Sequence, residues 1–581
     1  MVARSSSGAA CMWVLKSSDF LRLVNMPSHE ELRRMGLLVQ WQTGFFCIFV
    51  SHQWLGLNHP DPRGEQLPVL QEALRNLLAG SKLSVDAVSE LFGHMISIKA
   101  EDLRLQESYV WMDWFSIPQD KLQPAQFSAV DDGHEPLGSS EDESAPSMQH
   151  TTSQQCYISK IPVFVELCNM FVVLVPHVRH TDTGATCNYG SWLSRAWCRL
   201  ELWCKMLAQN ASIPVVVVTA PDQLEFAVPS HWIDRPPHEG EFTFEADRDR
   251  ISFIMKKLLK RKLQSLEDSD NLNTLRYFVA RYNTLLGKPC PQRTLSSFLA
   301  DFRFESLKCA KTVHGMSPMA CAVLSGDAAL ISVLCDAGCD VDRPIETLHD
   351  LAVNTTGTPL VLAVSQGWRH EPVLTALLEH GADANAVNDW SYPVLGYCKT
   401  ARSVELLVQH QADVNKQTAP AFIPPLSLAC FNCAAPEVIA MLLKHGAHAN
   451  PVRRGTAGIY PLANLAVYAS VNPKSLTVAD LLLDAKADVN MQYDSSHGIF
   501  RVLELVSRIR VMFGSTSPMA HLMAEWTTTP LGYASFFGND EMVDFLLKAR
   551  ADPEIPNARG RTPIQLARSQ RVLSVFSQEP R

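Results

Sequence analysis

The sequence predicts two parts of different fold class, an α/β part with a parallel sheet followed by an all-α solenoid. Two observations predict this division. Before residue 314, short apolar runs alternate with amphipathic stretches, as strands and helices alternate in α/β folds. From 314 to about 575, an opening and a closing phrase recur near the roughly 33-residue period of a helix-pair repeat. Because the 581 residues exceed the roughly 300 at which single cores stop growing, more than one domain is expected.

The α/β part is predicted over residues 44–220. Its strands are expected in GFFCIFVSHQW at 44, YVWMDWF at 109, FVVLVP at 171 and IPVVVVT at 213, all short apolar runs. Amphipathic helices are expected in EQLPVLQEALRNLLAG at 65 and around residue 201. Because helices separate the strands, we expect a parallel sheet covered on both faces, with sites at the carboxyl ends of its strands.

Three further segments flank or interrupt this part. Residues 1–43 are predicted as an N-terminal helical extension, and residues 221–313 as a helical connector. The connector contains FIMKKLLKRKLQSL, whose basic residues are expected on a solvated helix face. Residues from about 120 to 155 are polar and acidic, and they cannot bury enough surface to offset chain entropy, so a disordered insertion is expected there.

The repeats from 314 to 575 have a simple physical interpretation. Openers such as TGTPLVLAVSQG at 356 place a proline in the first turn of a helix, where its missing N–H costs nothing. Closers such as EHGADAN at 379 place a glycine where the second helix ends in a left-handed turn. Each pair exposes an apolar face unless a neighbour covers it, so six to seven units are expected to stack. The doubled spacing over about 491–526 indicates either an inserted segment or a decayed repeat.

This stretch resembles the ankyrin repeat family. The T-P-L-H-x-A signature of that family appears as TPLVLA at 358, TPLGYA at 529 and TPIQLA at 562, with the histidine replaced each time. The resemblance implies a protein partner bound on the concave surface of the solenoid. CFNC at 430 has the spacing of a zinc ligand pair but lacks the second pair that such a site needs, so no metal is expected.

The α/β part resembles TIR domains, which have a flavodoxin-like parallel sheet. The most specific match is Trp197, Cys198, Glu201 and Leu202, which fit the WCxxEL pattern of plant-type TIR domains. The same part is similar to fungal heterokaryon-incompatibility (HET) domains through SHQWLG at 51, YVWMDWFSIPQ at 109 and RAWCRLE at 195. The resemblance covers residues 44 to about 220.

The TIR resemblance implies a role for Glu201. Many TIR domains cleave the bond between nicotinamide and ribose in NAD, with the glutamate at this motif position as the catalytic acid. A carboxylate suits this chemistry because a nearby negative charge stabilises the oxocarbenium character that develops on the ribose. The alternative is a solvated glutamate paired with Lys205 at the i,i+4 spacing. Both interpretations remain open at this point.

Seven other residues are predicted to line a pocket for NAD. Five follow the first two strands and two lie on the same helical face as Glu201: His52, Gln53, Trp54, Asp113, Trp114, Ser194 and Trp197. Either Trp54 or Trp114 could stack on a nicotinamide or adenine ring. The alternatives are that both tryptophans are packing residues and that His52 is a hydrogen-bonded structural histidine.

Composition limits the classes of partner that are expected for the protein. The net charge of −9 argues against nucleic acid, which requires concentrated positive charge. The scattered cysteines and the lack of a 20-residue apolar run favour a cytoplasmic protein without a membrane span. We expect a signalling or interaction protein whose ankyrin array binds a protein and whose TIR/HET-like domain acts by self-association or NAD cleavage. The alternative is an NAD glycohydrolase regulated by the array, with NAD as substrate and no required cofactor.

Overall fold

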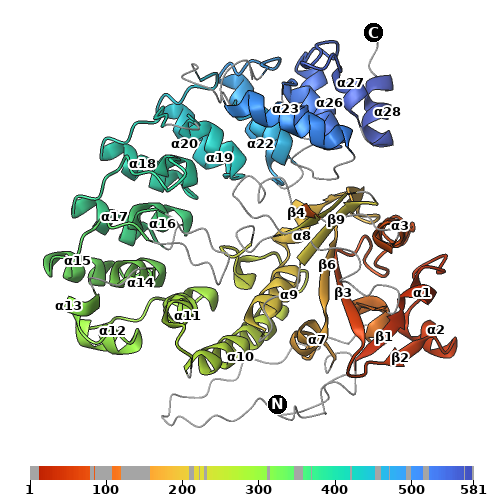
Figure 1. Ribbon diagram of the computed structural model, residues 1–581, viewed down its shortest axis with the longest axis horizontal. Coiled ribbons are helices and arrows are strands. Elements are labelled where there is room, and N and C mark those ends of the chain that lie inside the picture. The colour runs from red at the N-terminus through yellow and green to blue at the C-terminus, as the bar shows by residue number, and fades with distance from the viewer. Residues whose placement is uncertain are drawn as a thin grey trace, which may run out of the picture.

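The computed structural model describes most of the chain (Figure 1). The described residues are 12–78, 84–85, 108–119, 157–208, 215–221, 223–227, 232–267, 269–310, 315–345, 357–367, 370–418, 422–451, 460–469, 472–492, 499–513, 523–525, 527–567 and 569–578. The predicted acidic insertion at about 120–155 therefore lies outside the described residues. None of the described helices has the length and apolar character needed to cross a membrane.

An eight-stranded sheet forms the centre of the N-terminal part. Its order is β2-β1-β5-β3-β6-β9-β10-β4. The strands are β1 (Trp13–Lys16), β2 (Leu38–Gln40), β3 (Phe46–His52), β4 (Ser84–Val85), β5 (Ser108–Met112), β6 (Met170–Leu174), β9 (Val215–Ala220) and β10 (Gln223–Phe226). The four central strands β5, β3, β6 and β9 are parallel to one another. The predicted parallel sheet is therefore correct for the centre only.

The edges of the sheet depart from the prediction. On one side β1 pairs antiparallel with β5, and β2 pairs antiparallel with β1. On the other side β10 pairs antiparallel with β9. The expectation of a helical extension over residues 1–43 is wrong, because this segment supplies two edge strands together with the short helices α1 (Ser17–Phe20) and α2 (His29–Arg34).

Both faces of the central strands are buried, as the continuous apolar runs predict. In β3, Cys47 and Phe49 belong to the core on one face, and Ile48 and Val50 to the core on the other. Helix α3 (Leu67–Leu78) supplies Leu70, Leu74 and other apolar side chains to the second of these cores. Helices α7 (Ile161–Leu167) and α9 (Ala196–Leu207) pack in the first.

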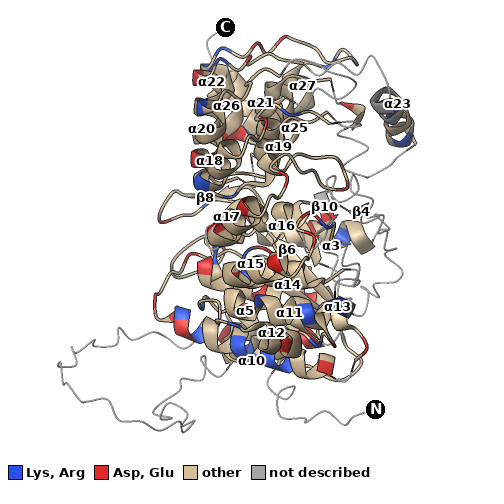
Figure 2. Cartoon of the chain, turned by 90° about the vertical axis from the view of Figure 1, so that its left-hand side faces the viewer, with Lys and Arg blue, Asp and Glu red and all other residues tan. Residues whose placement is uncertain are grey.

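The connector links the sheet to the repeats. Helix α10 (Asp247–Glu267) packs on α9, and α11 (Leu272–Leu285) packs on both α10 and the first repeat helix. Two shorter helices follow, α12 (Leu295–Asp301) and α13 (Leu307–Ala310). Lys256, Lys257 and Lys260 of α10 are exposed while Met255 and Leu258 are buried, and Figure 2 shows basic residues along this helix. These lysines line a solvated face, as the sequence predicts.

The C-terminal part is a stack of seven helix pairs within the described residues. The pairs are α14 (Pro318–Ser325) with α15 (Ala328–Asp336), α16 (Pro359–Ser365) with α17 (Glu371–Glu379), the 3₁₀ helix η8 (Val394–Tyr397) with α18 (Ala401–Gln409), α19 (Pro425–Phe431) with α20 (Pro436–Lys444), α21 (Pro461–Tyr468) with α22 (Ser475–Asp484), α25 (Pro530–Phe536) with α26 (Asp540–Lys548), and α27 (Pro563–Leu566) with α28 (Gln570–Gln578). Figure 1 shows the pairs in an arc with the sheet inside it.

Asparagines in the closing phrases join consecutive pairs. Asn415 donates its side-chain amide to the Gly446 carbonyl (2.9 Å) and accepts from the backbone N–H of His448 (2.9 Å). Asn450 makes the same two bonds to Lys486 and Asp488, at 2.7 and 2.8 Å. Each asparagine thus satisfies backbone groups of the next loop that would otherwise lack partners.

This ladder explains the doubled spacing. Asn490 accepts a hydrogen bond from the N–H of Asp552 (2.8 Å), in the loop that follows α26, and α25 packs directly on α21, so the α21–α22 and α25–α26 pairs are consecutive in the stack. The helix α23 (Ile499–Met512) within that stretch stands beside the array rather than in its stack (Figure 2). The segment is an insertion and not a decayed repeat.

Candidate functional site

The alternation of β3 sends two adjacent side chains to opposite faces of the sheet. Ser51 follows Cys47 and Phe49 in register and faces α9, whereas His52 follows Ile48 and Val50 and faces α3. Both residues lie at the carboxyl end of the strand, where sites gather in parallel sheets. The candidate site therefore has two halves that meet at this strand end.

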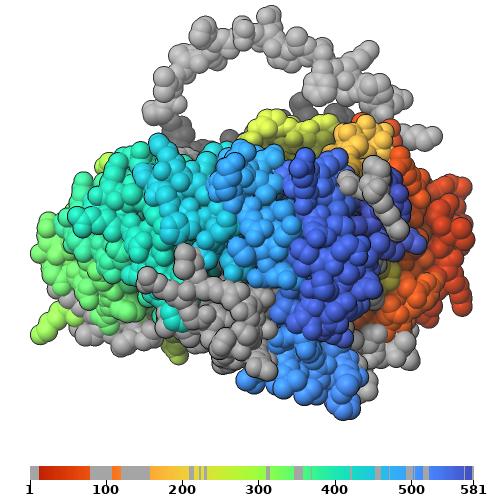
Figure 3. Space-filling model, turned by 90° about the horizontal axis from the view of Figure 1, so that it is seen from above, coloured from red at the N-terminus to blue at the C-terminus, as the bar shows by residue number. Residues whose placement is uncertain are grey.

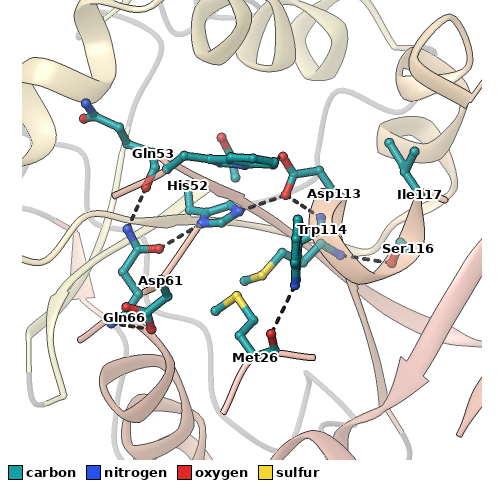
Figure 4. Close-up of polar contacts among 12 residues, drawn as sticks. Met26, His52, Gln53, Asp61, Gln66, Asp113, Trp114, Ser116 and Ile117 are labelled. Carbon is teal, nitrogen blue, oxygen red and sulfur yellow. Dashed lines mark hydrogen bonds and ion pairs between the residues drawn. The ribbon is translucent and has the colours of Figure 1, made fainter. Parts of the chain in front are cut away.

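The first half is centred on His52, whose side chain is 1% exposed. Its Nδ1 donates to Gln66 Oε1 (2.8 Å) and its Nε2 donates to Asp113 Oδ1 (2.9 Å). Figure 4 shows the imidazole held between these two side chains. The amide nitrogen of Gln66 donates to the Gln53 carbonyl (2.7 Å), which fixes the amide so that its oxygen faces the ring. Both ring nitrogens thus face acceptor oxygens, an arrangement that favours the imidazolium form of His52.

The pKa values of the pair agree with this assignment. Burial alone would lower the pKa of His52, but the Asp113 charge and its hydrogen bond outweigh burial, so the pKa of His52 is raised. Burial alone would raise the pKa of Asp113, but His52 outweighs it, so the pKa of Asp113 is lowered. Trp54 Nε1 also donates to Asp113 Oδ2 (2.9 Å). Asp113 is thus a carboxylate with several donors at the end of β5.

The two tryptophans are anchored by the protein. Trp114 donates its indole N–H to the Met26 carbonyl (3.1 Å), and its ring meets Trp54 edge to face with centroids 5.5 Å apart. Both side chains are half-buried. These contacts favour the interpretation of Trp54 and Trp114 as packing residues, because their polar atoms and relative orientation are already fixed.

The second half of the site contains Glu201. Its carboxyl group accepts a hydrogen bond from Ser51 Oγ, and Ser51 in turn accepts from the indole N–H of Trp192 (3.1 Å). Burial raises the pKa of Glu201 to about 8, with a further increase from Asp113 and opposing effects of Ser51 and His52. Glu201 is therefore not the solvated glutamate of the alternative interpretation, and Lys205 is itself buried, with its pKa lowered to about 8 by burial.

Ser194 and Trp197 lie elsewhere. The helix expected to carry them with Glu201 is broken at Arg195, where α8 (Tyr189–Ser194) ends and α9 begins. Ser194 Oγ donates to the Ser191 carbonyl (2.7 Å) and to Glu241 (3.1 Å). Trp197 Nε1 donates to Asp247 of α10 (2.9 Å). Their hydrogen bonds thus run to neighbouring α8 and to the connector, and not to the strand-end residues.

Sequence reasoning missed four residues that organise this site. Ser51 and Trp192 hold Glu201, and Gln66 orients His52. Asp61 accepts from the N–H groups of Glu65, Gln66 and Leu67 at 2.7, 2.9 and 2.9 Å, and so caps the start of α3. The alternation along β3 was the available signal for Ser51, since it places that hydroxyl opposite the helix that carries Glu201.

The remaining predicted residue, Gln53, links the two halves. Its side-chain oxygen accepts from Ser191 Oγ of α8 (2.7 Å), and its carbonyl accepts from Gln66. The structure thus brings together His52, Gln53, Trp54, Asp113, Trp114 and Glu201 at one end of the sheet. Among the residues that the structure describes, no three His, Cys, Asp or Glu side chains are grouped so that they could hold a metal ion.

Comparison with known families identifies the C-terminal part. The ankyrin repeat model matches residues 357–389 and 528–558. The stacked helix pairs are ankyrin repeats. Residues 357–389 cover α16 and α17, and residues 528–558 cover α25 and α26, the first pair after the insertion.

Two solved structures are similar over the repeats. The human ASB11 ankyrin repeat domain is 20% identical, with a TM-score of 0.33, over 46% of this chain and 99% of that one. The ankyrin repeat domain of Bcl-3, described as a unique member of the IkappaB protein family, is 22% identical, with a TM-score of 0.31, over 46% and 100%. No curated protein matches the chain. The repeat assignment rests on the family model and on the asparagine ladder.

Proposed function

We propose that this protein is an interaction protein in which the ankyrin repeats bind a protein partner and the α/β part acts as effector. The observation that supports it is the laddered array itself, which holds a row of loops in fixed register and presents them on one side. The inner side of the arc faces the protein's own sheet (Figure 1), so we place the partner on the loops between pairs and not on the concave surface that the ankyrin resemblance implies.

Trp390 is the residue on these loops best suited to anchor a partner. It lies between α17 and η8 and is 39% exposed, and exposed tryptophans are enriched among residues that dominate binding energy. Its loop is fixed by Asn388, whose side-chain oxygen accepts from the N–H groups of Trp390 (3.1 Å) and Tyr392 (2.9 Å). A tryptophan on a fixed loop loses little entropy on binding.

Quantitative affinity capture with full-length protein tests this proposal. We expect Trp390→Ala to reduce recovery of the partner about tenfold, as loss of a central aromatic anchor does. Phe244→Ala removes an aromatic side chain that is 68% exposed on the connector, and serves as the control. Equal loss in both variants, or in neither, would contradict a partner site on the repeat loops.

A second function, cleavage of NAD, is supported by the strand-end site and by the TIR and HET resemblance. The four parallel strands have the order β5-β3-β6-β9, which matches the start of the flavodoxin-like 2-1-3-4-5 order. Glu201, at the motif position of the TIR glutamate, lies beside Ser51 and within electrostatic reach of His52 and Asp113. Self-association of the α/β part is the other effector activity that we propose.

The proposed chemistry makes a specific demand on Glu201. Nicotinamide leaves NAD as a neutral base, so cleavage needs no proton, and an ionised carboxylate is what stabilises the oxocarbenium ion. With a pKa of about 8, Glu201 is mostly uncharged at pH 7 in this conformation. We therefore expect nicotinamide release to rise as the pH increases through about 8.

Incubation of the protein with NAD, with nicotinamide followed by chromatography, tests the second function. The rate is expected to increase from pH 6 to pH 9 in the wild type and to vanish in Glu201→Gln. Light scattering of the same samples over a concentration series reports self-association. Absence of nicotinamide at every pH and in every assembly state would leave the α/β part without this activity.

A further inference from the structure

Four contacts join the C-terminal ankyrin repeats to the end of the sheet that carries the candidate site. His177 Nε2 lies 2.9 Å from Asp540, and Arg179 donates to Glu541 (2.9 Å). Thr186 Oγ1 donates to the same Glu541 oxygen (2.6 Å). The fourth contact is between Arg571 and Glu65 (3.1 Å).

These contacts share one side of the array. Asp540 and Glu541 open α26, and Arg571 opens α28, so all three lie at the turn between the two helices of a pair. Gln366, at the turn between α16 and α17, likewise donates to Asp234 of the connector (3.3 Å). The loops between pairs lie at the opposite ends of these helices. The α/β part therefore occupies the turn side and leaves the loop side to a partner.

On the sheet side, the contacts fall on two segments that follow parallel strands. His177, Arg179 and Thr186 belong to the hairpin of β7 (Val178–Arg179) and β8 (Thr186–Cys187), which follows β6. Glu65 belongs to the loop at residues 53–66, which follows β3. The hairpin also holds this loop: Thr181 Oγ1 donates to the Leu55 carbonyl (2.8 Å), and Asp182 accepts from the Leu57 N–H (2.8 Å).

We propose that the last two ankyrin repeats form an intramolecular clamp that closes the 53–66 loop over the strand-end site and lowers the activity of that site until the clamp opens. Figure 3 shows the C-terminal repeats directly against the N-terminal part. The clamp is defined as the pairs His177–Asp540, Arg179–Glu541 and Arg571–Glu65. The effect of the clamp on activity rests on the proposed NAD cleavage, whereas its effect on the order of the 53–66 loop does not.

A continuous chain of contacts connects the clamp to the imidazolium. Glu65 is followed by Gln66, and the N–H groups of both are bound by Asp61. Gln66 contacts His52, and His52 contacts Asp113. Release of Arg571 from Glu65 therefore loosens the turn that orients Gln66. Opening also admits water to Glu201, whose uncharged state depends on burial.

The clamp has the properties of a reversible contact. The side chains of Arg179 and Arg571 are 50% and 40% exposed, and ion pairs of this kind are weak and sensitive to salt. Such a contact can open without unfolding either part. A partner that binds the loop side and changes the curvature of the array would pull the turn side away.

A charge reversal with its compensating partner tests the proposal in the full-length protein. Glu541→Arg places a cation against Arg179 and removes the acceptor of Thr186. The double variant Glu541→Arg with Arg179→Glu restores the ion pair. Glu437→Arg changes the corresponding exposed acid in the first turn of α20 and is the matched control.

Hydrogen exchange of peptides from residues 53–66 and 178–187 is the readout, because it does not depend on activity. We expect exchange at least about threefold faster in Glu541→Arg, restored in the double variant and unchanged in Glu437→Arg. We also expect Glu541→Arg to release nicotinamide faster at pH 7 than wild type. Unchanged exchange in Glu541→Arg would overturn the clamp, as would faster exchange without rescue.

The activity result separates the two proposals. If exchange accelerates and is rescued, but no variant releases nicotinamide at any pH, the clamp stands as a structural latch and the NAD proposal fails. If wild type and Glu541→Arg release nicotinamide equally while exchange differs, the clamp is present but does not restrain the site. That outcome would overturn the proposed effect of the clamp on activity.

Discussion

At the residue scale, the surroundings of His52 favour its charged form, whereas those of Glu201 favour its uncharged form. The imidazole of His52 has a carboxylate beside it, whereas the half-buried Glu201 faces a hydroxyl group. Glu201 is hydrogen-bonded to Ser51, which is the neighbour of His52 on β3. The Glu201 carboxyl group and the His52 imidazole therefore interact electrostatically at the end of the sheet. The two nearby carboxyl groups differ, because the pKa of Glu201 is raised and that of Asp113 is lowered, and such a divergence is typical of acid–base sites.

The raised pKa of Glu201 predicts a stability cost that depends on pH. In the unfolded chain the group ionises near 4.5, and in the folded protein near 8, so the folded state loses stability as the pH rises between these values. Glu201→Gln removes this cost. We expect the variant to match wild type at pH 4 and to be more stable by roughly 2 kcal/mol at pH 8.

Thermal unfolding of both proteins across this pH range is the measurement. The difference between variant and wild type isolates Glu201, because the other groups titrate alike in both. A difference that stays constant from pH 4 to pH 8 would show that Glu201 is ionised in the folded state.

The His52–Asp113 pair is expected to add stability over a range of pH, whereas ionisation of Glu201 costs stability. The raised pKa of His52 contributes stability below about 6.5 that is lost as the pH rises through its folded value. The lowered pKa of Asp113 contributes stability above about 3.8 that is lost as the pH falls. Asp113→Asn should therefore destabilise the protein most between pH 3.8 and pH 6.5, because it leaves the buried charge of His52 without its partner. Since Asp113 is 35% exposed and solvent screens the pair, we expect a loss of only about 2 kcal/mol.

Denaturant unfolding at pH 5.5 and pH 9 tests this expectation. Asp182→Asn changes an exposed aspartate in the neighbouring hairpin and should stay within about 0.5 kcal/mol of wild type. An equal loss for Asp113→Asn at both pH values would mean that His52 carries no charge in the folded protein.

The sequence predicted the six residues of the strand-end cluster because they follow strands or a family motif. It could not predict that Ser194 and Trp197 turn away, since that depends on the extended backbone of Arg195 between α8 and α9. Gln66 was also missed. Its role requires the capped loop of Asp61, which is a contact between residues that no periodicity relates.

At the element scale, the helix α23 of the insertion buries polar side chains and exposes apolar ones. In α23, Glu504 and Ser507 are buried, while Val502, Leu505 and Met512 are 58%, 58% and 73% exposed. Burial of polar groups gives little hydrophobic stabilisation. The array gains little from this helix, whereas the direct bond from Asn490 to Asp552 maintains the stack.

Replacement of residues 493–521 by a short Gly-Ser linker should therefore leave the array folded. The ends are already close, since Gln492 donates to the Thr527 carbonyl (3.2 Å). We expect the melting temperature to change by less than about 3 °C, and solubility to improve through loss of exposed apolar surface.

Asn490→Ala is the informative comparison for this deletion. It removes the acceptor of the Asp552 N–H and should cost about 1 kcal/mol, or several degrees at most. Calorimetry of both variants decides the point. A deletion that destabilises more than Asn490→Ala would mean that α23 is a structural part of the array.

The central strands and the repeats were predictable as elements, and the sheet edges were not. The runs in β3, β6 and β9 are continuously apolar because both faces are covered, which is a strong local signal. By contrast, β1 and β2 are four and three residues long, and three of their seven residues are exposed. Such short edge strands are defined by their pairing partners, which the local sequence does not reveal.

At the scale of the whole molecule, one apolar core runs without interruption from the sheet into the repeats. Phe171 of β6, Leu258 of α10, Phe278 of α11 and Leu324 of α14 belong to the same cluster. The segment predicted as a connector is therefore a structural bridge. Its helix α11 covers the first repeat, as the terminal caps of solenoids do.

Two fragments of the array should differ in stability for this reason. A fragment of residues 315–581 exposes the face of α14 that α11 covers, including Met319 and Val323, which are 3% and 0% exposed in the full chain. A fragment of residues 269–581 keeps α11. It also keeps the hydrogen bonds from the Met316 N–H to Asn273 (3.1 Å) and from Arg276 to the Phe302 carbonyl (2.9 Å).

We expect the longer fragment to be monomeric and to melt at least about 5 °C above the shorter one, because an uncapped repeat leaves apolar surface in water. Leu275→Asp in the longer fragment places a charge in the α11 core and should abolish the difference. Leu272→Asp, at a residue that is 37% exposed on the same helix, is the control. Equal melting temperatures of the two fragments would show that α11 does not stabilise the array, which would then begin at α14.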